Sequence, residues 1–203
     1  MESLCRLAEF LESMANKKST DPNNLAEWAK ANKRQHAGLF TCEENIELQE
    51  AGALNEFVTA LKRGDKLFFK NVRRGNDPPD FEADDTDGND IGIEVTEFVE
   101  SSAAAAARAG IPYEKTYWRD DLISELDAII RTKDGASLRE GDSFSDYVLL
   151  VYTDEAMESL DATIALLEKH AFPATTLITR AFFLISYLPG FEYPLIELKI
   201  AGR

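Results

Sequence analysis

Residues 78–82 read PPDFE, and residues 91–98 read IGIEVTEF. The segment between them is rich in Asp, Asn and Gly, which are typical of tight turns. The apolar–polar alternation of the second stretch predicts a strand, and the two stretches together predict a β-hairpin. Asp80 lies on the first strand of this hairpin and Glu94 lies on the second. The pattern therefore predicts two carboxylates on paired strands.

The alternation also assigns the faces of the second strand. Glu94 shares a face with Gly92 and Thr96, whereas Ile93 and Val95 belong to the opposite, apolar face. We therefore expect Glu94 to lie apart from the apolar side chains of its own strand.

Periodicity on either side of the hairpin predicts an α/β domain with a central mixed sheet and helices on its faces. The preceding helix has Thr41 as its expected N-cap and Gly64 as its stop. The continuous apolar run at residues 147–152 is typical of a strand buried on both faces. The expected elements are a helix at 42–63, strands at 66–72, 79–83 and 90–99, helices at 101–109 and 118–132, a strand at 147–152, a helix at 155–170, and strands at 181–187 and 193–200.

Length and composition indicate a globular protein. We expect residues 1–40 to form a helical extension and residues 41–203 to form a single α/β domain. The chain is 44% hydrophobic and 29% charged, which is the profile of a folded protein. It has no apolar run of the roughly 18–20 residues that cross a bilayer and no signal-peptide pattern. A cytoplasmic protein without a membrane partner is therefore expected.

Several kinds of site are disfavoured. Cys5 and Cys42 are too few for a disulfide framework and lack metal-ligand spacing. The histidines, His36 and His170, are too few to favour a zinc site or a Ser-His-Asp triad. The acidic turn resembles a calcium loop, but an EF-hand requires Glu at the position occupied by Thr96.

The hairpin carboxylates favour a different metal. Mg²⁺ takes oxygen ligands and keeps several of its waters, so two or three carboxylates are enough to bind it. Asp80 and Glu94 supply two, and the carbonyl of Val95 is a candidate for another ligand. We therefore expect a site for Mg²⁺ or Mn²⁺ on the hairpin.

Residues 42–153 resemble the PD-(D/E)xK nuclease superfamily, which has the restriction-endonuclease-like fold. Pro79-Asp80 matches the first part of its motif, and Glu94-Val95-Thr96 matches the second. The expected order of a helix, three strands, a helix and a buried strand also matches its αβββαβ core. The resemblance implies a metal-dependent hydrolase that cleaves phosphodiester bonds in DNA, or else in RNA, with N-terminal helices and C-terminal strands added to the core.

The resemblance implies roles for individual residues. Asp80 and Glu94 would be metal ligands, and a glutamate of the preceding helix would join them. Helical projection favours Glu50 and then Glu47 for this third position. The superfamily has Lys where this chain has Thr96, which carries no charge. We hypothesise that Lys70, or else Lys115 or Lys133 beside the next helix, supplies the missing cation.

Charge bears on the partners. The net charge is −15, which argues against a broad nucleic-acid surface because phosphate binding relies on Lys and Arg. An acidic surface instead suits a basic protein partner. A local basic cluster nevertheless precedes the hairpin and is a candidate contact for nucleic acid: Lys62, Arg63, Lys66, Lys70, Arg73 and Arg74.

Two alternatives stay open from the sequence. A catalytically inactive member of the same fold would act as a protein-binding, inhibitor or immunity-type module, which Thr96 and the net charge of −15 favour. An unrelated α/β protein would carry the hairpin incidentally. Nucleases of this fold often form homodimers, so a dimer is also an expectation of the resemblance.

Overall fold

A computed structural model describes residues 46–99, 121–135, 138, 143–153, 159–185 and 193–202. The chain divides into two compact units, Met1–Gln35 and His36–Arg203, and every described residue belongs to the second. The helical extension expected at residues 1–40 and the helix expected at 101–109 lie outside the described residues. So do Cys5, His36, Thr41 and Cys42.

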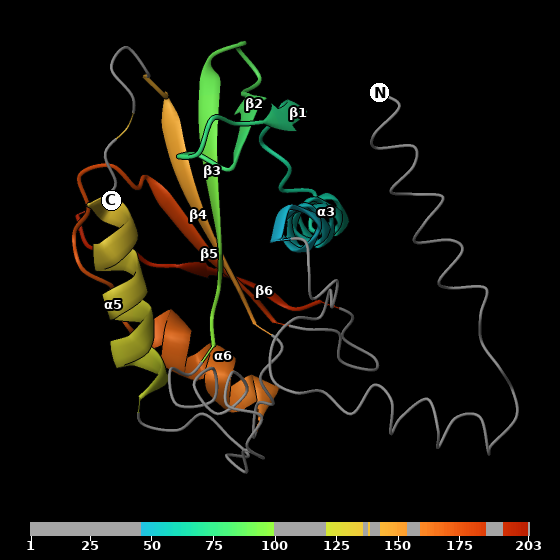
Figure 1. Ribbon diagram of the computed structural model, residues 1–203. Helices are drawn as coiled ribbons and strands as arrows, with labels where there is room; N and C mark the ends of the chain where they lie inside the picture. The colour runs from blue at the N-terminus through green and yellow to red at the C-terminus, as the bar shows by residue number, and fades with distance from the viewer. Residues whose placement is uncertain are drawn as a thin grey trace, which may run out of the picture. The chain divides into compact units, whose positions relative to one another are not determined.

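The second unit is an α/β domain built on a mixed sheet of six strands (Figure 1). The strands lie side by side in their order along the chain, β1-β2-β3-β4-β5-β6. The described elements are α3 (Ile46–Arg63), β1 (Lys70–Arg74), β2 (Phe81–Asp84), β3 (Asp90–Glu97), α5 (Leu122–Asp134), β4 (Asp146–Thr153), α6 (Leu160–Lys169), β5 (Arg180–Ile185) and β6 (Leu195–Leu198).

Strand direction follows from the connections. β1, β2 and β3 form an antiparallel meander, because short loops join them. β4 runs parallel to β3 and β5 runs parallel to β4, with α5 and α6 on the intervening connections. β6 then returns antiparallel to β5. The sheet therefore changes from antiparallel to parallel pairing at β3, the strand that carries Glu94.

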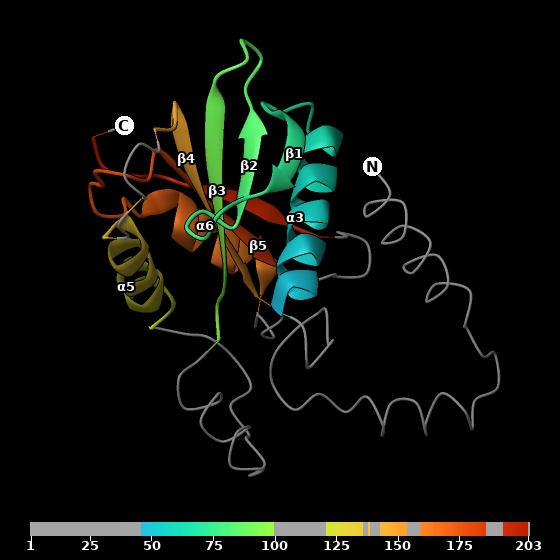
Figure 2. The same ribbon diagram turned by 45° about the horizontal axis from the view of Figure 1, so that its top comes forward.

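Helices cover both faces of the sheet, with α3 on one side and α5 and α6 on the other (Figure 2). The α3 side has a core of Ala53, Leu54, Phe57, Leu61, Ile91, Ile93, Val95, Val148 and Leu150, among others. The opposite core includes Leu122, Leu126, Ile130, Tyr147, Leu149, Val151, Leu167 and Phe183. β3 and β4 therefore send alternate side chains into two separate cores.

The elements expected near the hairpin agree with the structure, apart from the starts of the strands expected at 66–72 and 79–83. β2 begins at Phe81, so Asp80 directly precedes this strand rather than lying on it as predicted. α3 ends at Arg63 as predicted, and β4 is buried on both faces as predicted. The strand expected at residues 66–72 is wrong at its start, because β1 begins only at Lys70. Lys70 pairs with Asp84, the last residue of β2, so earlier residues have no partner strand there. Arg73 and Arg74, expected in a loop, belong to β1.

Candidate active site

A tight loop presents Asp80 at the start of β2. The backbone N–H of Gly75 donates to the Asp80 carbonyl at 2.8 Å, and that of Asp77 donates to the Pro79 carbonyl at 3.0 Å. A Cβ at position 75 would lie 2.1 Å from the Pro79 carbonyl oxygen, so the close approach requires glycine. The loop therefore fixes the backbone on which Asp80 sits.

The Asp80 carboxylate is buried and bound to the neighbouring strand. Asp80 is only 6% exposed, and its Oδ2 accepts a hydrogen bond of 2.7 Å from the backbone N–H of Val95. Val95 directly follows Glu94. This hydrogen bond therefore holds the Asp80 carboxylate at the peptide group that joins Glu94 to Val95.

Glu94 lies on β3 and faces α5. It pairs in register with Leu149 of β4 and is 5% exposed. Its Oε1 lies 2.6 Å from the Lys133 ammonium, and its Oε2 accepts a hydrogen bond of 3.3 Å from the Tyr147 hydroxyl. The prediction that Glu94 lies apart from Ile93 and Val95 is confirmed, because those residues belong to the α3 core.

The two carboxylates interact electrostatically. Burial raises the pKa of Asp80 to about 6, and the hydrogen bond from Val95 opposes this rise. The negative charges of Glu94 and Glu50 raise the pKa of Asp80 further, whereas the charge of Lys133 lowers it. Glu94, Glu50 and Lys133 therefore all lie close enough to Asp80 to influence its pKa.

Tyr147 covers the Glu94 side of β3. It pairs with Gly92, and its ring occupies the space above that glycine. Burial and the negative charge of Glu94 raise the pKa of Tyr147, so its hydroxyl stays protonated and donates to Glu94. From the sequence, residue 147 is predicted only to lie in a buried strand. A glycine across from a tyrosine is the signal that would have linked the two strands.

Lys133 reaches Glu94 from the last turn of α5. The next residue, Asp134, fixes that turn, since its carboxylate accepts hydrogen bonds from the segment leading into β5. The donors are the backbone N–H groups of Thr176, Leu177 and Ile178, at 2.8–3.0 Å, and the hydroxyl of Thr176 at 3.1 Å. Asp134 thus attaches the end of α5 to the sheet.

Glu50, the favoured helix glutamate, lies on α3. Its Oε2 lies 2.7 Å from the Arg74 guanidinium, an ion pair that lacks hydrogen-bond geometry. The side chain is 14% exposed, whereas Glu47 is exposed to solvent. The negative charge of Glu50 therefore raises the pKa of Asp80, whereas the counter-ion of Glu50 is Arg74.

The remaining candidates are placed as follows. Thr96 pairs with Val151 and is half-buried. The Lys70 ammonium donates to the Thr86 carbonyl at 3.2 Å, in the turn of the hairpin. Lys115 lies outside the described residues. Of the two candidate lysines that the structure describes, Lys70 and Lys133, it is Lys133 that contacts Glu94.

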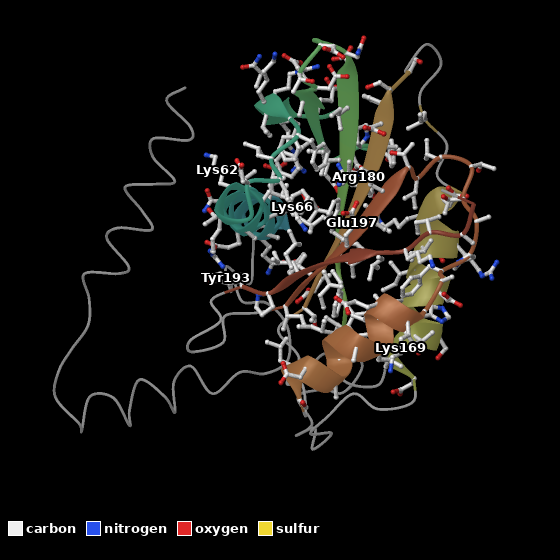
Figure 3. All side chains as sticks on the ribbon, turned by 180° about the vertical axis from the view of Figure 1, so that it is seen from behind. Lys62, Lys66, Lys169, Arg180, Tyr193 and Glu197 are labelled. Carbon is white, nitrogen blue, oxygen red and sulfur yellow. The ribbon has the colours of Figure 1, made fainter. Side chains whose placement is uncertain are left out.

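The basic cluster is partly neutralised by carboxylates. Arg73 pairs with Glu82 and Asp84 of β2 and with Asp90 of β3. Arg74 pairs with Glu50 and lies over the Phe81 ring, 4.8 Å from its centroid. Lys62, Arg63 and Lys66 are exposed at the end of α3, and Figure 3 shows the two lysines there.

A third arginine, Arg180, is also paired with a carboxylate. Arg180 of β5 pairs with Glu197 of β6 at 2.8–3.0 Å, and its guanidinium lies 3.9 Å from the centroid of the Phe68 ring. Figure 3 shows Arg180 and Glu197 together over these two strands. Arg180 therefore serves the packing of the sheet edge.

The donor set fits a hard cation that keeps its waters. Within the part of the chain that the structure describes, no three His, Cys, Asp or Glu side chains are grouped to hold a metal. Asp80, directly before β2, and Glu94, on the adjacent strand β3, nevertheless form a pair of buried carboxylates. Mg²⁺ binds to proteins through one or two carboxylates together with substrate phosphate, so this pair suits it.

Comparison with known proteins gave no relatives. A scan of family models, a search of curated proteins and a search of solved structures each found no match to this chain. Among the helices described, none has the length and apolar character needed to cross a membrane.

Proposed function

We propose that this protein is a metal-dependent nuclease-like hydrolase of phosphodiester bonds, with a restriction-endonuclease-like core. The element order supports the proposal: α3, an antiparallel meander of β1 to β3, then α5 and the parallel strand β4. Asp80, directly before β2, and Glu94, on β3, are the residues whose sequence context resembles the motif carboxylates. DNA is the first candidate substrate and RNA the second.

The observation that carries the proposal is the burial of two like-charged groups beside each other. Asp80 and Glu94 are 6% and 5% exposed, and the charge of Glu94 raises the pKa of Asp80. Burying an ionised carboxylate is unfavourable, and a second carboxylate nearby makes it more so. A carboxylate with a pKa as strongly perturbed as that of Asp80 is typical of functional sites, where a cation can compensate its charge.

In the proposed reaction, Asp80 and Glu94 hold the metal ion. Bound Mg²⁺ or Mn²⁺ would polarise the phosphate and lower the pKa of an attacking water. Val95 orients Asp80 through its backbone N–H, and Tyr147 orients Glu94 through its hydroxyl. Thr96 supplies no charge, so the ammonium of Lys133 is the cation nearest to Glu94 among the described contacts.

Plasmid cleavage with Mg²⁺ or Mn²⁺ tests the proposal, with EDTA as the metal-free condition. Asp80→Ala and Glu94→Ala should each abolish cleavage. Asp87→Ala, which changes an exposed carboxylate of the hairpin turn, should cleave as the wild type does. Cleavage that persists in both site variants would come from a contaminating nuclease and would remove the support for the proposal.

A second candidate function is a non-catalytic protein-binding module of the same fold. The ion pair between Lys133 and Glu94 favours it, because the ammonium already compensates one carboxylate without a metal. The net charge of −15 suits a basic protein partner. Absence of both Mn²⁺ binding and cleavage in the purified wild-type protein would favour this candidate over the nuclease.

A further inference from the structure

We propose that Lys133 is a displaceable counter-ion of the carboxylate pair. In the metal-free protein its ammonium binds Glu94; when a divalent cation takes Glu94, the ammonium is released to the edge of the site, where it binds the substrate phosphate. This inference rests on the proposed nuclease function and concerns how the Lys133 ammonium becomes available to the substrate phosphate.

The contact itself suggests exchange. Lys133 Nζ lies 2.6 Å from Glu94 Oε1, yet the Lys133 side chain is 30% exposed and that of Glu94 is only 7% exposed. The ammonium therefore approaches a buried carboxylate from the solvent side. A lysine stem is flexible and its ammonium is a compact point charge, so the head group can leave without moving the helix.

The charges of the site give the direction of the exchange. Lys133 Nζ lies 2.6 Å from Glu94 Oε1, so the ammonium neutralises this carboxylate when no metal is bound. A divalent cation on the same pair would place like charges beside each other, and the ammonium would then be repelled. Glu94 can therefore bind either the Lys133 ammonium or the divalent cation, but not both at once.

The helix end stays in place during such an exchange. Asp134 accepts hydrogen bonds from Thr176, Leu177 and Ile178, which holds the last turn of α5 against the segment before β5. Because Lys133 directly precedes Asp134, these contacts also hold the backbone of Lys133 in place. The movement is confined to the lysine side chain, and its range keeps the ammonium beside the site.

The released ammonium would provide a positive charge that no side chain of β3 provides. Thr96 has no charge, and Arg73 and Arg74 are paired with carboxylates. A phosphodiester held through a metal at Asp80 and Glu94 would be anionic, and its negative charge would increase as water attacks the phosphorus. An ammonium held nearby stabilises that charge, as preorganised donors do at many active sites.

Calorimetric titration of the full-length protein with Mn²⁺ tests the proposal. Lys133→Met should raise the Mn²⁺ affinity at least about tenfold, because the competing cation is gone. The same variant should melt at a lower temperature in EDTA and regain stability with Mn²⁺. Its cleavage rate should fall on the order of 10²- to 10³-fold, as when one charge-stabilising donor is lost. Lys169→Met, which changes an exposed lysine of α6 (Figure 3), is the matched control and should leave all three values unchanged.

Two outcomes overturn the inference, and they differ. If Mn²⁺ binds the wild type and binds Lys133→Met equally or more weakly, Lys133 does not compete for Glu94, and only this inference fails. If neither protein binds Mn²⁺, the proposed nuclease function fails as well. If Lys133→Met does not fold, Lys133→Gln keeps a hydrogen-bond donor without the charge, and the same criteria apply to it.

Discussion

The ring of Tyr147 on β4 occupies the space above Gly92 on β3, directly across the parallel pair. A Cβ at position 92 would lie 2.8 Å from Tyr147 Cδ2 and 3.0 Å from Cε2. The ring can therefore approach the strand this closely only because residue 92 has no side chain. That position brings the Tyr147 hydroxyl to Glu94, two residues further along β3.

Gly92→Ala should therefore destabilise the protein. The added methyl group must displace an aromatic ring that is 1% exposed, and overpacking of this kind costs typically about 1–3 kcal/mol. Urea unfolding measures the loss. Gly135→Ala is the matched control, because its Cβ would meet nothing closer than 3.5 Å, and it should change stability by less than about 1 kcal/mol.

The double variant Gly92→Ala/Tyr147→Leu separates the clash from other effects. Removing the ring should make the alanine at position 92 much less harmful than it is in the wild-type background. Additive losses from the two changes would show that the ring is not what excludes a side chain at residue 92.

Asp134→Ala should be among the most destabilising surface changes. It leaves the backbone N–H groups of Thr176, Leu177 and Ile178 without their acceptor. Unsatisfied donors cost about 1–3 kcal/mol each when buried, and partial exposure here suggests a total of roughly 2–4 kcal/mol. Urea unfolding at pH 7 measures the effect, with Glu168→Ala, an exposed carboxylate of α6, as the control. Equal losses in the two variants would contradict the anchoring role.

The hydrogen bonds of Asp134 also imply that the stability of the protein depends on pH. Burial raises the pKa of its carboxyl, but the hydrogen bonds from Thr176, Ile178 and Leu177 outweigh burial and bring the pKa below its usual value. Its stabilising contribution is therefore present above the unfolded pKa of about 3.9 and is lost as the pH falls further. The stability difference between wild type and Asp134→Ala should shrink below about pH 4. A difference that stays constant down to pH 3 would contradict this account.

Local periodicity was sufficient to predict the hairpin and its faces. A period of two residues decides which side chains of a strand share a face, whatever the rest of the fold does. Glu94 could therefore be separated from Ile93 and Val95 from the sequence alone, and the structure places them accordingly. The buried strand β4 was predictable for a similar reason, because both of its faces meet apolar layers.

Contacts between distant segments were not predictable in this way. Lys133 lies 39 residues after Glu94, and where the last turn of α5 meets β3 depends on the crossover connection. The sequence favoured Lys70 and left Lys115 or Lys133 as alternatives. The start of β1 was also missed, because alternation at residues 66–69 does not reveal that β2 ends at Asp84.

Arg74→Ala should expose the dependence of Glu50 on its counter-ion. The change leaves the buried Oε2 of Glu50 without the guanidinium 2.7 Å away. Because Arg74 is 42% exposed, water can partly replace it, and a loss of about 1–2 kcal/mol is expected rather than the larger loss of a fully buried pair. Adding Glu50→Gln should recover part of the loss, measured by thermal unfolding. No recovery would show that Arg74 acts mainly through its packing on Phe81.

Asp80→Asn should stabilise the metal-free protein at neutral and higher pH. Burial, followed by the charges of Glu94 and Glu50, raises the pKa of Asp80 to about 6, against the opposing hydrogen bond from Val95. For an acid with a raised pKa, the ionised form is unfavourable in the folded state. The destabilisation therefore develops as the pH rises from the unfolded pKa of about 3.9 through 6 and is complete above that value. A difference of about two pH units corresponds to at most about 3 kcal/mol.

The asparagine keeps an oxygen that can accept the N–H of Val95, so the change removes the charge and preserves the contact. Urea unfolding in EDTA should show Asp80→Asn to be more stable than wild type at pH 8 and nearly equal to it at pH 4. Mn²⁺ should stabilise the wild type and not the variant, because the ligand charge is gone. A variant that is less stable than wild type at pH 8 would mean that the Asp80 charge is already compensated in the metal-free protein. In that case the buried pair would need no further cation, and the main support for a metal site would be lost.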